Sequence, residues 1–95
     1  MLVRRVSGKS MAPTLKPGRI VIGQRGYDAT RRLKVGDIII IKHDGLEKIK
    51  RVALLRDNEV YVLGDNSAAS TDSRHFGWLP LSAVYALVVW PRAKP

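Results

Sequence analysis

A serine near the amino terminus stands in a setting that suits a nucleophile. Ser10 is followed by Met-Ala-Pro-Thr-Leu and is preceded, two residues earlier, by Gly8. Pro13 and Pro17 each fix φ and remove a backbone donor, so this stretch cannot form a continuous helix or a central strand. We therefore expect a rigid loop that presents the Ser10 hydroxyl. A serine hydroxyl becomes a good nucleophile only when a neighbouring base takes its proton, so the rest of the chain must supply that base.

Lys50 is a candidate base because of its place in a predicted strand. Over residues 46–55, strand alternation puts Lys50 on the face that carries Val52 and Leu54. Burial among such residues favours the neutral amine and lowers a lysine pKa by up to about 3–5 units. A lysine with a pKa lowered in this way can act as a general base near neutral pH. On alternation alone, a solvated lysine on a basic strand is the favoured alternative, because most lysines lie at the surface.

Two histidines are the other candidate bases. His43 lies in a predicted hairpin turn, where a histidine is commonly solvated. His75 follows Asp72-Ser73-Arg74 and would allow a Ser-His-Asp arrangement with Ser10. We prefer Lys50 because its predicted strand offers the burial that a neutral lysine needs.

Three separated segments resemble the motifs of the type I signal peptidase family. The first is Gly8-x-Ser10-Met11-x-Pro13-Thr14-Leu15, and the second is Lys50-Arg51-Val52, about forty residues downstream. The third runs from Gly64-Asp65-Asn66 through Thr71-Asp72-Ser73-Arg74 to Phe76-Gly77-x-Leu79-Pro80. Gly36-Asp37-Ile38-Ile39-Ile40 also matches a family strand that lies between the first two motifs. The segments follow the family order and, with their connecting strands, cover most of the chain.

This resemblance implies a serine endopeptidase with a Ser/Lys dyad. Ser10 would be the nucleophile and Lys50 the general base that deprotonates it. Ser70 aligns with the family serine that hydrogen-bonds the lysine and orients it. Asp72 and Arg74 align with a charged pair that supports the site. The resemblance implies no cofactor and no metal.

The resemblance also implies where the oxyanion and the substrate would lie. The backbone N–H of Ser10 is the expected first donor to the oxyanion. Some family members add a serine hydroxyl two residues before the nucleophile, but this chain has Gly8 there, which leaves the second donor open. The substrate is expected to bind as an extended strand, with Met11 and the strand before Lys50 along its path. The family's supporting loop corresponds to Asp65 and Asn66.

A phosphate-binding loop is excluded, although Gly8-Lys9-Ser10 has the ending of one. That motif requires a glycine five residues before Gly8, where this chain has Val3, and Pro13 opposes the helix that must follow. The sequence also lacks the local signatures of penicillin-binding, α/β-hydrolase and zinc peptidase chemistry.

Composition limits the class of protein further. The chain has 95 residues, of which 45% are hydrophobic, and it has no cysteine, so disulfides and thiolate metal sites are excluded. Its 17 Lys and Arg outnumber its 8 Asp and Glu, which gives a formal net charge of +9. A basic β-domain that binds nucleic acid is therefore the non-enzymatic alternative. We do not favour nucleic acid as a partner, because the basic residues are scattered and no nucleic-acid-binding motif is visible.

Turn residues divide the chain into short strands without a helical period, which predicts an all-β fold. We expect a compact antiparallel β-domain over residues 1–95, of the signal peptidase catalytic-core type and with little or no helix. The isoleucines of residues 38–41 predict a strand covered on both faces. Long loops are expected over residues 23–36 and 64–75, with one helical turn over residues 80–83. The expected strands are residues 2–6, 19–22, 37–42, 46–55, 59–63 and 84–90.

Two features distinguish this sequence from typical signal peptidases. It shows neither a membrane anchor before the serine motif nor a large insertion after the lysine strand. We expect either a trimmed form or a small soluble branch, and the chain most resembles the branch that matures nickel-containing superoxide dismutase. The substrate would then be the amino-terminal extension of the dismutase precursor, and the location the cytoplasm. The alternatives are a membrane-associated signal peptidase domain that cleaves secretory precursors after small residues, and a relative of the self-cleaving repressor domains.

Overall fold

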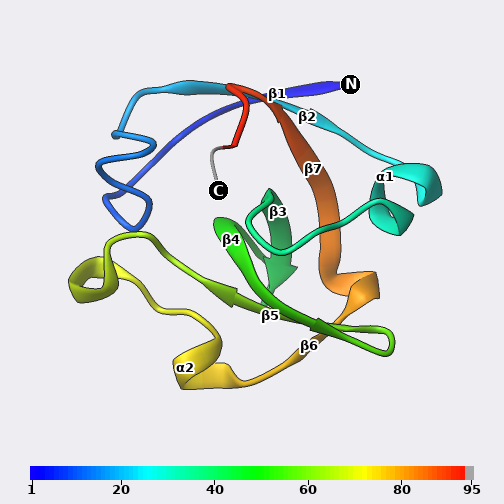
Figure 1. The fold of residues 1–95 in the computed structure, drawn as a ribbon. Helices are drawn as coiled ribbons and strands as arrows, with labels where there is room; N and C mark the ends of the chain where they lie inside the picture. Colours follow the sequence, from blue (N-terminus) through cyan, green and yellow to red (C-terminus); the bar gives the residue numbers. More distant parts are fainter. Residues whose placement is uncertain (94–95) are drawn as a thin grey trace.

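Seven β-strands form one antiparallel sheet in the computed structural model, which describes residues 1–93 (Figure 1). The elements in chain order are β1 (Leu2–Arg5), β2 (Ile20–Gln24), α1 (Tyr27–Arg31), β3 (Ile38–His43), β4 (Leu46–Arg56), β5 (Glu59–Leu63), a 3₁₀ turn (Ser67–Ala69), α2 (Ser73–Phe76), β6 (Leu79–Pro80), a second 3₁₀ turn (Leu81–Ala83) and β7 (Val84–Trp90). The strand order across the sheet is β1-β2-β7-β3-β4-β5-β6. The all-β prediction is confirmed.

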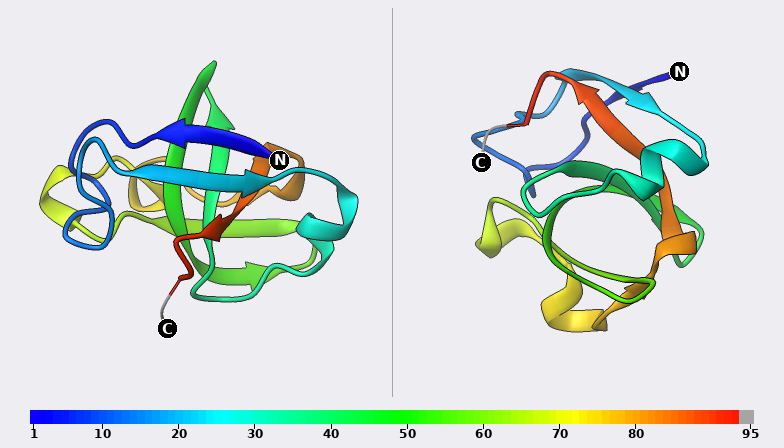
Figure 2. Two further views of the ribbon diagram at one scale, coloured as in Figure 1. Left: turned by 90° about the horizontal axis from the view of Figure 1, so that it is seen from above. Right: turned by 45° about the vertical axis from the view of Figure 1, so that its right-hand side comes forward.

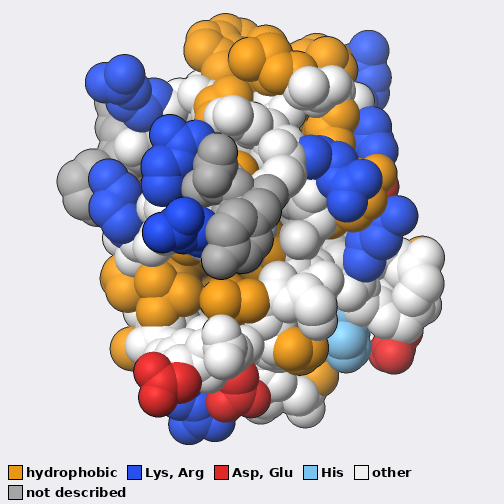
Figure 3. All heavy atoms as spheres, turned by 90° about the vertical axis from the view of Figure 1, so that its right-hand side faces the viewer, with side chains coloured by type: hydrophobic (Ala, Val, Ile, Leu, Met, Phe, Trp, Pro, Cys, Tyr) orange, Lys and Arg blue, Asp and Glu red, His pale blue; other side chains and the backbone are white. Residues whose placement is uncertain are grey.

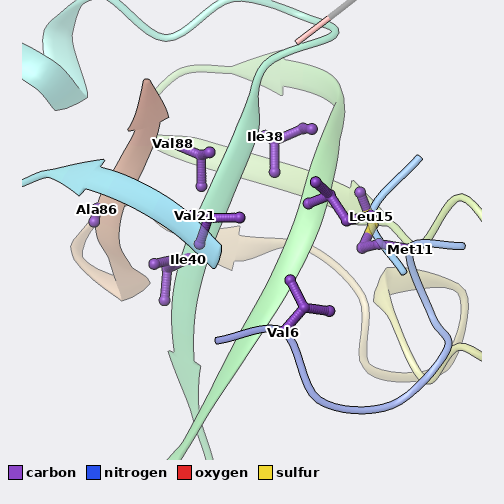
Figure 4. Packing of buried hydrophobic residues seen from close by; sticks show 8 residues of the cluster. All are labelled: Val6, Met11, Leu15, Val21, Ile38, Ile40, Ala86 and Val88. Atoms are coloured by element: carbon purple, nitrogen blue, oxygen red, sulfur yellow. The ribbon is translucent and has the colours of Figure 1, made fainter. Parts of the chain in front are cut away.

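Strand β3 is covered on both faces, as its run of isoleucines predicts. Ile38 and Ile40 pack into one cluster with β2, β7 and the loop of residues 7–18, which we call the serine loop. Ile39 and Ile41 pack into a second cluster with β4 and β5. Figure 4 shows the first cluster, to which the serine loop contributes two side chains. Each buried side chain of this size contributes about 1.5–3 kcal/mol, so the serine loop is fastened to the centre of the sheet.

The two predicted long loops contain short helices, which corrects that part of the prediction. Strand β2 runs to Gln24, and α1 follows inside the segment expected to be a loop. Helix α2 begins after Asp72, whose side chain accepts from the Arg74 N–H while His75 Nδ1 accepts from the Asp72 N–H. This reciprocal cap satisfies donors at the start of the helix. Helices of four or five residues are too short to leave a periodic pattern in the sequence.

The β3–β4 hairpin turns where the sequence predicts a turn. Asp44 and Gly45 adopt positive φ angles of 53° and 76°, the combination that a two-residue type I′ turn requires and that favours Asp-Gly. Strand β4 then pairs with β3 in a register that sets Lys50 opposite Ile39. The hairpin thereby places the lysine beside the middle of a buried strand.

A bulge in β4 limits how far strand alternation predicts its faces. Lys50 and Val52 are 4% and 1% exposed, as alternation predicts. The register with β5 then shifts between Val52 and Leu54, and Leu54 is 52% exposed. A bulge adds one residue to one strand and disrupts the alternation beyond it. The expectation that Leu54 shares the buried face of Lys50 is therefore wrong.

Strand β1 and the first half of β4 both have an unpaired edge. Within residues 1–93, β1 pairs with β2 alone, and residues 46–50 of β4 pair with β3 alone because pairing with β5 begins at Arg51. Figure 2 shows β1 and β2 lying across the β3–β4 hairpin, and the side chains of Arg4 and Glu47 meet there. Unpaired strand edges can take up an additional extended segment.

Candidate active site

The serine loop is rigid because two of its side chains are buried. Met11 and Leu15 are each 1% exposed and belong to the first core cluster. Turn hydrogen bonds join Ala12 N to Lys9 O at 3.1 Å and Leu15 N to Met11 O at 2.8 Å. Ser10 is only half-buried. The loop therefore combines a fixed backbone with an accessible serine.

The loop after β5 braces the serine loop. The Asn66 N–H donates to the Ser10 carbonyl at 2.8 Å. Thr14 Oγ1 donates to Asp65 Oδ2 at 2.5 Å, and Arg51 donates two hydrogen bonds of 2.8 Å to the same carboxylate. The Arg51 guanidinium holds the pKa of Asp65 below its usual range. A charged carboxylate thus joins β4 to the loop that carries Ser10.

Lys50, Ser70 and Asp72 form a buried chain of hydrogen bonds. Lys50 Nζ donates to Ser70 Oγ at 3.2 Å, and the Ser70 hydroxyl donates to Asp72 Oδ2 at 2.8 Å. All three residues are buried, and Asp72 is fully inaccessible. Because the Ser70 hydrogen is engaged by the carboxylate, its oxygen is left to accept from the lysine. The chain therefore sets the direction in which the Lys50 amine points.

Asp72 anchors this chain. Its carboxylate accepts from the Gly64 N–H at 2.9 Å, and from Arg74 through Nε at 2.9 Å and Nη2 at 2.8 Å. Burial by itself would raise the pKa of Asp72, but the hydrogen bonds from Arg74, Gly64 and Ser70 outweigh burial and hold that pKa well below its usual range. Asp72 is consequently a permanent negative charge behind Ser70.

Burial lowers the pKa of Lys50. The Asp72 carboxylate raises this pKa in part, and the positive charges of Lys48 and Arg74 lower it again. The net direction is downward because the loss of solvation has the largest effect. A neutral lysine is the form that can accept a proton from a hydroxyl.

Ser10 and Lys50 line the same cavity, which we call the cleft. Its volume is about 340 Å³, and it lies between the end of β1 with the following residues and the first half of β4. The lining residues are Arg4, Arg5, Val6, Ser7, Ser10, Met11, Glu47, Lys48, Ile49 and Lys50. The cleft thus brings a serine hydroxyl and a desolvated amine to one surface, between two unpaired strand edges. These are the groups that acyl transfer through a serine requires.

Of the other predicted site residues, Met11 lines the cleft and the rest lie around it. Met11 borders the cleft with its largely buried side chain, whereas Gly8 lies in the exposed part of the serine loop at φ 76°. Ser70, Asp72 and Arg74 stand behind Lys50: Ser70 accepts from the lysine, Asp72 accepts from Ser70, and Arg74 donates to Asp72. The strand before Lys50, expected along the substrate path, contributes Glu47, Lys48 and Ile49 to the cleft lining. The sequence analysis did not identify Arg4, Arg5, Val6 and Ser7 as cleft residues. Only the pairing of distant strands brings them there.

The two histidines have structural partners. His75 Nδ1 accepts the Asp72 N–H at 3.2 Å, which uses the lone pair that a base would need. The His43 ring packs on Phe76 with 4.2 Å between ring centroids, so it is more than a solvated turn residue. Neither histidine is among the residues that line the cleft.

Among the side chains that the structure describes, no three His, Cys, Asp or Glu gather as a metal site. No helix in the described part of the chain is long and apolar enough to cross a bilayer.

Comparison with known families agrees with this geometry. The family model described as signal peptidase, peptidase S26, matches residues 1–56 and 46–92 of the chain. A search of curated proteins found no match. The two matched segments include the serine loop, strand β4 with Lys50, and the loop after β5 that carries Ser70 and Asp72. The chain therefore belongs to the signal peptidase family of serine peptidases, peptidase S26.

Proposed function

We propose that Ser10 and Lys50 form a catalytic dyad that cleaves a peptide bond. The observation that carries this proposal is the buried Lys50 amine, which shares the cleft with Ser10 and is oriented by Ser70. Its lowered pKa favours the neutral form more than in a solvated lysine, and the neutral amine is the form that acts as a base. Membership of the signal peptidase family supports the reaction class.

The first half of the reaction forms an ester on Ser10. Lys50 Nζ takes the proton of the Ser10 hydroxyl while Oγ attacks the carbonyl carbon of the scissile bond. The Ser10 backbone N–H is the proposed donor to the oxyanion that develops. The tetrahedral intermediate collapses when the Lys50 ammonium gives its proton to the leaving amine. The carboxyl-terminal product departs, and the amino-terminal part of the substrate stays attached to Ser10.

The second half hydrolyses that ester. A water molecule gives a proton to Lys50 and attacks the ester carbonyl, and the proton then passes to Ser10 Oγ as the acyl group leaves. Lys50 acts as a base and then as an acid in both halves. Ser70 and Asp72 are proposed as positioning residues, because their hydrogen bonds hold the amine in one direction throughout.

The proposed substrate is the amino-terminal extension of a nickel-type superoxide dismutase precursor. Support comes from the resemblance of this short sequence to the branch of the family that matures this dismutase. Removal of the extension would free the terminal amine and the nearby residues that bind nickel in the dismutase. The unpaired edges of β1 and β4 offer an extended segment backbone partners on both sides of the cleft.

Incubation with two precursors tests the proposal. One is a nickel superoxide dismutase with its propeptide, and the other is a secretory precursor with small residues before its cleavage site. The native protein and a Ser10→Ala variant are compared, and mass spectrometry identifies each new amino terminus. We expect the native protein alone to cleave the dismutase precursor, at one site. Cleavage of the secretory precursor instead would identify a signal peptidase, and cleavage by the Ser10→Ala variant would contradict the dyad.

A Gly64→Ala substitution is expected to damage the site more than the fold. A Cβ at this position would lie 2.2 Å from Ser70 Oγ and 2.7 Å from the Ser10 carbonyl oxygen, so the two groups must move apart. A displacement of this kind costs about 10²-fold in rate, while overpacking costs about 1–3 kcal/mol of stability. Peptide cleavage and thermal unfolding, measured together, check this expectation.

The control for that variant is Gly45→Ala, in the β3–β4 hairpin. There the added Cβ meets nothing within 4 Å, although the positive φ of 76° strains any residue with a side chain. We expect a comparable loss of stability, about 1–2 kcal/mol, with almost no loss of rate. Equal losses of rate in the two variants would contradict the role given to Gly64.

A further inference from the structure

An ion pair spans the cleft on the β1 side of the catalytic residues. Arg4 Nε and Nη2 donate to Glu47 Oε1 and Oε2 at 2.8 and 3.1 Å. Arg4 comes from β1 and Glu47 from β4, and both residues line the cleft. The pair therefore connects the two strands whose unpaired edges flank the proposed substrate path. It is the part of the cleft that a bound strand must pass or displace.

The ion pair lies three residues along β4 from Lys50, because Glu47 belongs to that strand. At a rise of about 3.3 Å per residue, this separation is about 10 Å. An extended substrate beside β4 has the same rise. Its side chain three or four residues from the scissile bond would therefore reach Arg4. We take this side chain to precede the scissile bond, because that part of the substrate stays attached to Ser10 and must remain bound.

The charges around the pair favour an acidic side chain in the substrate. Arg4, Arg5 and Lys48 line this part of the cleft, and Glu47 is the one carboxylate among the cleft residues. Even without Lys50, these cleft residues carry two more positive than negative charges. Arg4 and Glu47 are only partly covered, with side chains 38% and 31% exposed, so Glu47 can turn to solvent when another carboxylate takes its place. Arginine pairs with any carboxylate through the same two-pronged geometry.

We propose that Arg4 is a specificity-determining residue, an inference that rests on the proposed function. It pairs with a substrate carboxylate three or four residues before the scissile bond, and Glu47 occupies it when the cleft is empty. The preferred substrate therefore carries Asp or Glu at that place. Glu47 acts as a resting partner that a neutral substrate side chain cannot displace.

Positive charge elsewhere on the molecule would also attract an acidic peptide, so a test of Arg4 needs a control for this long-range attraction. Figure 3 shows Lys and Arg side chains mostly over the upper part of another face, with Asp and Glu beside further basic side chains near its lower edge. Such charges attract an acidic peptide from a distance, whatever the cleft does. Arg56 offers a matched control, because it forms an ion pair of 2.8 Å with Glu59 and does not line the cleft.

Binding to a Ser10→Ala protein tests the inference without cleavage. The probes are peptides spanning the processing site of the nickel superoxide dismutase precursor, with Glu or Gln placed third or fourth before the scissile bond. We expect the Glu peptide to bind about fivefold more tightly at one of these places, the effect of one partly exposed ion pair. Adding Arg4→Gln should abolish the preference, and adding Glu47→Gln should increase it. Adding Arg56→Gln should leave it unchanged.

The outcomes separate this inference from the proposed function. Equal dissociation constants at both places, or no binding of either peptide, overturn the inference. A preference that survives Arg4→Gln overturns it as well, provided that thermal unfolding shows the variant to be folded. Cleavage of the Gln peptide by the native protein, together with no preference for Glu, would leave the dyad standing while the role of Arg4 fails.

Discussion

A Ser10→Ala variant is expected to lose cleavage activity by about 10⁴-fold or more, with almost no change in the free energy of unfolding. The rate falls because the nucleophile is gone, and only binding and the remaining donors still assist water. Stability is retained because the Ser10 side chain is half-buried and the loop is fixed by other groups, among them Met11 and Leu15 in the core. Single-turnover cleavage and thermal unfolding measure the two quantities.

The control for this variant is Ser67→Ala. Ser67 is an exposed serine in the 3₁₀ turn after β5, and its backbone carbonyl, rather than its side chain, accepts a bond from Arg74. We expect its cleavage rate to stay within about twofold of the native protein, as for most surface substitutions. A Ser10→Ala protein that keeps more than a hundredth of the native rate would show that another residue attacks the substrate.

Local patterns in the sequence predict the strands and the burial of Lys50. Side-chain alternation is a property of the strand itself, so the burial of Lys50 follows from its place two residues before Val52. The unbroken isoleucines of β3 predict a strand with two covered faces for a similar reason: each face needs apolar side chains of its own. Alternation fails at Leu54, where a bulge interrupts it. A bulge depends on how neighbouring strands pair, which one strand does not reveal.

The walls of the cleft depend on pairings between distant parts of the chain. Arg4 and Glu47 are 43 residues apart and meet only because β1 lies across the β3–β4 hairpin. The bond from Thr14 to Asp65 joins residues 51 apart. Neither pair follows a local period, so composition and spacing cannot predict them. The motif segments mark the residues near the reaction, and the sheet order determines what surrounds them.

A Lys50→Met variant is expected to lose about 10²–10⁴-fold in cleavage rate, the usual contribution of a general base. Its fold should be as stable as that of the native protein or more so, because methionine has a similar length and needs no solvation. Loss of rate with retained stability would show that the buried amine serves chemistry rather than folding. A variant that keeps the native rate would contradict the role of Lys50.

The same variant should change how activity and stability depend on pH. Burial lowers the pKa of Lys50 in the folded protein, whereas the unfolded chain keeps the ordinary value of about 10.4. Between these two pKa values the unfolded state binds one more proton, so native stability rises with pH relative to Lys50→Met until about pH 10.4. The cleavage rate should rise with pH through the lowered pKa. The variant should lack that rise, and pH-dependent unfolding and kcat/KM profiles check both expectations.

A Ser10→Cys substitution makes the Lys50 effect measurable without any substrate. The chain has no other cysteine, so an alkylating reagent reports on this one thiol. Lys50 can take the thiol proton and pair with the thiolate, which lowers the pKa of a cysteine beside a lysine. Alkylation near pH 7 should therefore be faster than in the Ser10→Cys, Lys50→Met double variant, by about tenfold for each unit of pKa difference. Equal rates would mean that the amine does not reach residue 10, and the dyad would then fail whatever the substrate proves to be.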